Sequence, residues 1–270
     1  VSSLELLSTT MTFQLTRGDA ATEIKIGNTI AYSGNASAYG VIAKLEAAFF
    51  KMVNDQGCVG GRKINFISYD DGYTPPKTVE QVRRLVEEDQ VALLFNTLGT
   101  PTNTAIHRYV NQKKIPHLFI STGADKWGDY EHFPWTMGYQ PSYRTEAQIY
   151  AKYMLKAKPG AKMGILYQND DFGKDYPAGV KDVLGADYDK IVPAVSYESG
   201  DATIDSQMSS LKSAGVDVLP AAAIPNFAAQ ARRKAHDTTC PPLSFLTPVT
   251  SRVASVQHHQ APQQPRTRRT

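Results

Sequence analysis

VALLFNTLGTPTNTAI, residues 91–106, is the stretch of the sequence that decides the fold. The apolar run from Val91 to Phe95 is too short for a helix of its own, and it is followed by the polar and glycine-containing NTLGT. Thr100 then precedes Pro101, which suits the first turn of a helix because its missing N–H is not needed there. This order predicts a buried parallel strand, a tight loop and a helix.

The predicted loop also has the chemistry of an anion site. The first N–H groups of a helix have no partner within it, and the positive end of the helix dipole lies behind them. Hydroxyl groups beside such a helix start complete a seat for a carboxylate. The alternative interpretation is an ordinary helix start that binds nothing.

The same order of elements extends along most of the chain. Apolar periodicity predicts strands at 23–29, 63–69, 115–120, 162–167, 191–197, 216–219 and 243–247. It predicts helices at 40–54, 77–89, 142–156, 175–184 and 225–236, and one that begins at Thr203 or Asp205 and ends at 214. Alternation of strands and helices with short connections predicts parallel sheets flanked by helices, in an α/β fold. We expect a first lobe over 22–140 and a second over 141–250, with a cleft between them.

The two ends of the chain have a different character. Residues 1–21 show no periodicity, and we expect an irregular lead-in that lacks the charged start and long apolar core of a signal peptide. Residues 251–270 are rich in Gln, Arg and Pro, and we expect a disordered polar tail. The net charge of +3 includes four arginines near this end, so the nearly neutral body argues against a nucleic-acid partner.

The sequence offers no group of residues typical of catalysis. The pairs Asp70–Asp71 and Asp170–Asp171 follow predicted strands, where neighbouring side chains point to opposite faces, so each pair is expected to cap turns and helix starts. The histidines are scattered, the two cysteines have no metal-ligand spacing, and no phosphate-binding glycine loop is present. We therefore expect no cofactor, no metal and no enzymatic activity.

The loops after the predicted strands are better suited to binding. AYSGNASAYG, DDGYTPP, NTLGT and STGAD supply hydroxyls, glycines and tyrosines, which form hydrogen bonds and aromatic walls. In open α/β sheets, ligands bind beyond the carboxyl ends of the strands, where these loops fall.

Several segments in this order resemble a known family. They are EIKIGNTIAYSGNASAYG (23–40), the stretch 60–106, the stretch 120–153 and MGILYQNDDFGKDY (163–176). Together they resemble the type I periplasmic solute-binding proteins, and more narrowly the branched-chain amino-acid (leucine/isoleucine/valine) binding proteins of bacterial ABC importers. The resemblance covers about 23–250. It implies two α/β lobes of a periplasmic monomer that close on a small carboxylate and deliver it to an ABC permease in the inner membrane.

The resemblance also implies site residues. Tyr39 matches a first-loop tyrosine that lines the cleft, and Thr100 matches the hydroxyl and backbone N–H that hold the ligand carboxylate. The loop with further polar contacts corresponds to Gly123, Ala124 and Asp125. Phe172 matches an aromatic residue of the second lobe that covers the ligand.

Two departures from the family bear on the ligand. Ile224, before Pro225, stands where the amino-acid binders carry a tyrosine, and no acid is present at 247–250, where they hold the ligand ammonium. An unpaired ammonium in a closed cleft is costly. The ligand expected here is therefore a carboxylate with an apolar or aromatic body.

A third departure concerns length. The match stops near Val249, so we expect a chain truncated at its C-terminus relative to the family, with a first lobe that lacks its closing segments and exposes apolar sheet edge. Three alternatives stay open beside an importer component: a ligand-sensing domain of the same fold, a doubly wound enzyme, and a non-functional truncated remnant.

Overall fold

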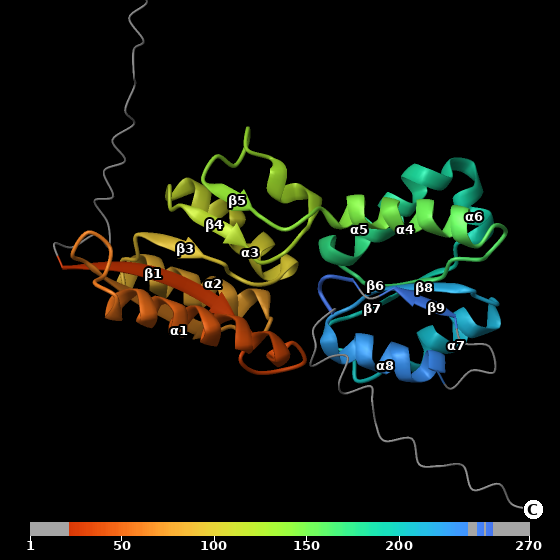
Figure 1. Ribbon diagram of the computed structural model, residues 1–270, viewed down its shortest axis with the longest axis horizontal. Helices are drawn as coiled ribbons and strands as arrows, with labels where there is room; N and C mark the ends of the chain where they lie inside the picture. Colours follow the sequence, from red (N-terminus) through yellow and green to blue (C-terminus); the bar gives the residue numbers. More distant parts are fainter. Residues whose placement is uncertain (1–21, 237–241, 246, 251–270) are drawn as a thin grey trace, which may run out of the picture.

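The computed structural model describes residues 22–236, 242–245 and 247–250, which form two parallel β-sheets flanked by helices (Figure 1). The predicted lead-in at 1–21 and the predicted tail at 251–270 lie outside the described residues. No helix in the described part of the chain is long and apolar enough to cross a bilayer.

The first sheet contains five parallel strands in the order β2-β1-β3-β4-β5. They are β1 (Glu23–Ile30), β2 (Lys63–Asp70), β3 (Leu93–Phe95), β4 (His117–Ile120) and β5 (Thr136–Gly138). The chain moves in opposite directions from β1 to β2 and from β2 to β3. Right-handed crossovers therefore place α1 (Val41–Asp55) on one face, and α2 (Pro75–Arg83) and α3 (Thr100–Gln112) on the other.

Strand β3 shows how the sequence assigns the two faces of this sheet. Leu94 is fully buried in the core that includes Leu85 and Val110, on the side of α2 and α3. The next residue, Phe95, points to the opposite face because side chains alternate along a strand, and its ring packs 5.6 Å from that of Phe50 in α1. The predicted strand, loop and helix at 91–106 are confirmed.

The α1 face of this sheet is only partly covered by the described residues. Helix α1 packs on the sheet through Ala43 and Phe50, whereas Leu45 and Phe49 on its outer side are 71% and 53% exposed. Aromatic ring contacts continue from Phe49 to Phe119 beside β5 and on to Tyr139. We call this surface the open apolar surface; it comprises Val41, Leu45, Phe49, Met52, Phe119, Met137 and Tyr139.

The second sheet contains four parallel strands in the order β7-β6-β8-β9. They are β6 (Ile165–Gln168), β7 (Ala194–Tyr197), β8 (Val218–Ala222) and β9 (Leu243–Phe245). Figure 1 shows α4 (Tyr143–Ala157) and α5 (Asp171–Leu184) on one side of this sheet, and α7 (Asp205–Ser213) and α8 (Pro225–His236) on the other. Helices therefore lie on both sides of this sheet.

Several predicted boundaries in the second lobe are wrong, among them the starts of the strands predicted at 162 and 216, which begin at Ile165 and Val218. The strand predicted at 191–197 begins only at Ala194, because Ile191 ends the short helix α6 (Tyr188–Ile191). The helix predicted to begin at 175 begins at Asp171, because the Asp170 carboxylate accepts hydrogen bonds from the next backbone N–H groups and caps the helix there. Pro177 consequently lies inside α5 rather than at its start.

Candidate functional site

A cavity of about 80 Å³ lies between the two lobes, at the carboxyl ends of the strands. Its first-lobe walls follow β1, β2, β3, β4 and β5, and its second-lobe walls follow β6, β8 and β9. The lining residues after these strands are Tyr39, Tyr73, Leu98, Gly99, Thr100, Ser121, Thr122, Gln140, Phe172, Ile224, Pro248 and Val249, joined by Ile42 from α1 and Tyr143 from α4. The position is the one that open parallel sheets offer to a ligand.

Hydroxyl groups gather at one end of the cavity. The Thr100 and Thr122 hydroxyl oxygens are 2.5 Å apart in a buried hydrogen bond, and the nearby Tyr143 hydroxyl donates to the Gln140 side-chain oxygen at 3.5 Å. Thr100 is the first residue of α3, so the positive end of that helix dipole lies at the same place. This end of the cavity is therefore suited to an anion held by neutral donors.

A tight loop brings the start of α3 against Tyr73. Gly99 has φ +97°, and a Cβ atom there would lie 2.5 Å from the Tyr73 ring, so only glycine fits. Tyr73 also has a positive φ, of 60°, and its turn is held by Asp71, whose carboxylate accepts from the Tyr73 N–H at 2.9 Å and from the Thr78 hydroxyl at 3.0 Å. The DDGYTPP segment thus places an aromatic wall beside the carboxylate seat.

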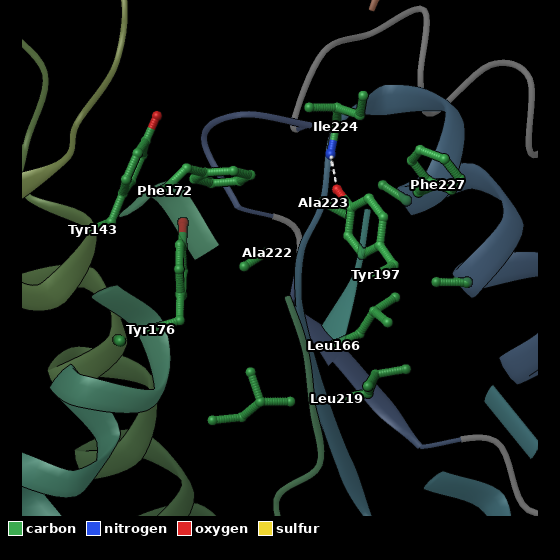
Figure 2. Packing of buried hydrophobic residues seen from close by; sticks show 14 of the residues in the cluster. Tyr143, Leu166, Phe172, Tyr176, Tyr197, Leu219, Ala222, Ala223, Ile224 and Phe227 are labelled. Carbon is green, nitrogen blue, oxygen red and sulfur yellow. Dashed lines mark hydrogen bonds between the residues drawn. The ribbon is translucent and has the colours of Figure 1, made fainter. Parts of the chain in front are cut away.

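The opposite wall of the cavity is apolar. Phe172 extends from the start of α5, and its ring lies 5.0 Å from that of Tyr143, edge to face. Figure 2 shows Phe172 reaching from α5 toward the loop that carries Ile224. The Tyr197 hydroxyl fixes this loop by accepting a hydrogen bond from the Ile224 N–H at 3.0 Å.

The cavity is electrically neutral. Among the described residues that line it, none carries a carboxylate, an ammonium or a guanidinium group. Burial raises the pKa of Tyr143 to about 12 and that of Tyr73 well above its usual value, so both phenols stay protonated at neutral pH. The site can donate hydrogen bonds to an anion, but its described walls hold no base beside a nucleophile.

Four of the seven predicted site residues line the cavity: Tyr39, Thr100, Phe172 and Ile224. Gly123, Ala124 and Asp125 do not line it. Gly123 allows the loop after β4 to approach the start of α4, since a Cβ there would lie 2.3 Å from the Pro141 carbonyl oxygen. The two preceding residues of the same loop, Ser121 and Thr122, face the cavity instead.

Asp125 has a different partner and lies at the outer rim. Its carboxylate accepts from the Ser142 hydroxyl at 2.8 Å, and its backbone N–H donates to Asp175 at 2.9 Å. Next to it, the Lys126 ammonium donates to the Asp171 carboxylate at 2.9 Å. These contacts join the first lobe to α5 of the second.

Contacts also join the lobes at other points around the cavity. The Asn35 amide donates to the Ser199 carbonyl at 3.0 Å, and the Tyr39 hydroxyl donates to the Val249 carbonyl at 3.1 Å. Together with the pairs at the outer rim, these bonds hold the two lobes closed over the cavity.

The acidic pairs and the buried His117 have structural partners. Asp70 accepts hydrogen bonds from Tyr32, Ser33, Gly72 and Lys77; burial opposes ionisation, but these bonds outweigh it and lower the pKa of Asp70. His117 bonds the Thr97 hydroxyl, and burial lowers its pKa to about 3. The described residues contain no cluster of three or more metal-ligand side chains.

A family model described as periplasmic binding protein matches residues 23–247. A Leu/Ile/Val-binding protein homolog of Brucella suis biovar 1 (strain 1330) is 25% identical over 216 residues, which are 74% of this chain and 52% of that protein. The chain thus spans about half the length of this curated relative.

Two solved structures share the fold. A fatty acid ABC transporter substrate-binding protein from Thermomonospora curvata is 22% identical with a TM-score of 0.72, over 84% of this chain and 58% of that one. A solute-binding protein of an R. palustris ABC transporter, solved in complex with benzoate, is 22% identical with a TM-score of 0.68, over 79% of this chain and 59% of that one. The two-lobed α/β architecture is common to all three.

Proposed function

The chain belongs to the periplasmic binding protein family, and from that premise we propose that it is the extracytoplasmic substrate-binding component of an ABC importer. We propose that it binds a small organic carboxylate with an apolar body between its lobes, in the periplasm, and presents it to a permease without catalysing a reaction. The observation that carries this proposal is the neutral cavity between the closed lobes, with hydroxyls at one end and apolar walls at the other.

The polar end accounts for the carboxylate. The Thr100 and Thr122 hydroxyls can each turn a hydrogen toward a ligand oxygen, and the first N–H groups of α3 add their dipole. Hydrogen bonds to a charged group contribute about 1.5–3 kcal/mol each, so a few neutral donors suffice without an arginine.

The apolar end of the cavity disfavours a ligand that carries an ammonium group. Ile224 and Phe172 present hydrocarbon where an α-amino group would need an anionic partner. Desolvating an unpaired ammonium costs several kcal/mol, more than a typical hydrogen bond returns. Of the two solved structures with this fold, one is described as a fatty acid substrate-binding protein and the other as a complex with benzoate. Fatty acids and benzoate are carboxylates without an ammonium group, which supports the same class of ligand here.

Cavity size limits the ligand further. The volume of about 80 Å³ is roughly half of the ~150 Å³ in which an engineered protein core holds benzene. A cavity of this size favours a small acid over a long-chain one.

A thermal-shift panel tests the proposal. The panel pairs leucine with its des-amino analogue 4-methylpentanoate, and adds 2-methylpropanoate and benzoate. A ligand at 100 times its Kd adds about 2.7 kcal/mol, which for a chain of this size raises Tm by about 5–10 °C. We expect the acids to raise Tm and leucine to leave it unchanged. Stabilisation by leucine alone contradicts the proposed ligand class.

A further inference from the structure

Gln168 connects three walls of the cavity although it does not line the cavity itself. It ends β6, is 2% exposed, and its side-chain amide makes hydrogen bonds in three directions. The amide nitrogen donates to the Tyr73 hydroxyl at 3.3 Å and to the Asp170 carboxylate at 2.5 Å. The amide oxygen accepts from the Tyr197 hydroxyl at 3.1 Å.

Each of these bonds leads to a residue that faces the ligand space. Asp170 accepts from the Phe172 N–H at 3.0 Å, so the helix cap that orients Phe172 also bonds Gln168. The Tyr197 hydroxyl accepts from the Ile224 N–H at 3.0 Å, so the loop that carries Ile224 is held in place through the Gln168 amide as well. The two apolar walls of the second lobe are therefore positioned through one buried side chain.

The third bond crosses between the lobes. Tyr73 belongs to the first lobe, where its ring packs against Gly99 at the carboxylate seat, and it is buried in the closed arrangement. The Tyr73 hydroxyl reaches Gln168 only while the lobes are together. The bond thus joins the polar end of the cavity in one lobe to the apolar walls in the other.

We propose that Gln168 is a positioning residue that couples closure of the lobes to the arrangement of Phe172 and Ile224. When Tyr73 arrives, it supplies the third partner of the amide and holds it in the orientation that Asp170 and Tyr197 require. When the lobes part, the amide loses this partner and the second-lobe wall loosens. The proposal rests on the proposed function for its ligand, but the coupling itself exists without one.

Amide hydrogen exchange of the unliganded 270-residue chain, followed by nuclear magnetic resonance, tests the coupling. The informative variant is Tyr73→Phe, which removes one hydroxyl from the first lobe and leaves every second-lobe residue in place. We expect exchange at the Ile224 and Phe172 amides to accelerate about 2- to 12-fold, the range that corresponds to one net hydrogen bond. Gln168→Met is expected to accelerate the same amides, and the double variant to add nothing further.

Tyr69→Phe is the matched control, because Tyr69 also loses a hydrogen bond in the first lobe, to Asp89 at 2.9 Å, but has no link to the cavity. It is expected to leave the Ile224 and Phe172 amides unchanged. If Tyr73→Phe leaves these amides at the parental rate, or if Tyr69→Phe accelerates them equally, Gln168 serves only the second lobe and the coupling is refuted. This holds even if Gln168→Met does not fold.

Benzoate separates this inference from the proposed function. We expect Tyr73→Phe to weaken benzoate binding by the factor seen in exchange. If benzoate fails to bind the parent chain while the exchange pattern is as expected, the ligand class is wrong and the coupling stands. If benzoate binds the parent chain but the exchange pattern is absent, the coupling is refuted and the proposed ligand class stands.

Discussion

Replacing Thr100 by valine is the sharpest test of the carboxylate seat. Valine has the shape of threonine without the hydroxyl, and Thr100 is 1% exposed, so the change leaves no cavity and removes one donor. In the unliganded chain the loss is one hydrogen bond between two neutral hydroxyls, which contributes about 0.5–1.5 kcal/mol. In the complex, the lost bond is one to a charged carboxylate and is worth about 1.5–3 kcal/mol. Since each 1.4 kcal/mol is a factor of ten, binding is expected to weaken about 10- to 100-fold.

Isothermal titration calorimetry with benzoate and 4-methylpentanoate measures this loss. Thr145→Val is the matched control, since Thr145 lies in the first turn of α4 with an exposed side chain outside the cavity. Thr122→Val is expected to show a loss similar to that of Thr100→Val, because the two hydroxyls form one pair. Thr145→Val is expected to bind both acids like the parent. If Thr100→Val also binds both acids as tightly as the parent does, the carboxylate seat lies elsewhere.

Three further predictions concern the rest of the molecule. Because the open apolar surface is exposed, we expect the chain to unfold with poor cooperativity and to self-associate, and Leu45→Gln with Phe49→Gln to reduce association in size-exclusion light scattering; a sharp single transition of a monomeric parent contradicts this. Burial raises the pKa of Glu46 from 4.5 to about 7, so its ionisation lowers stability as pH rises through that window, and Glu46→Gln should raise Tm at pH 8 but not at pH 4; equal effects at both values refute the assignment. Gly99→Ala should abolish acid binding in calorimetry, because its Cβ would meet the Tyr73 ring; unchanged affinity would show that the loop can yield.

Much of the fold follows from local patterns. A short apolar run followed by a polar loop and a proline predicted β3 and α3, and Thr100 at the helix start, because burial and helix initiation act on neighbouring residues. Ile191 shows where such patterns fail. Its run of apolar neighbours resembles a strand, but the chain closes a helical turn there before Pro193.

The site was predictable only in part, for a geometric reason. The resemblance to the family singled out Tyr39, Thr100, Phe172 and Ile224, and all four follow a strand, where parallel sheets offer a cleft. Which residues of the loop after β4 face the cavity depends on how closely that loop approaches α4, and this packing turns Thr122 rather than Gly123 toward the cavity. Tyr73 was missed because its side chain reaches the cavity only through a left-handed turn held by Asp71.

The hydrogen bonds that join the two lobes at the rims of the cavity affect how fast a ligand is released when the lobes part. Lys126 bonds Asp171 on one rim and Asn35 bonds Ser199 on another, so the lobes can part and release a molecule between them only after these two contacts break. The residence time of a ligand that leaves in this way is governed by the rate at which the lobes open, rather than by its contacts with the cavity alone. Hinge motions of this kind take place on the microsecond-to-millisecond scale or slower. Salt, which screens the exposed Lys126 pair, should shorten that residence without changing which molecules are accepted.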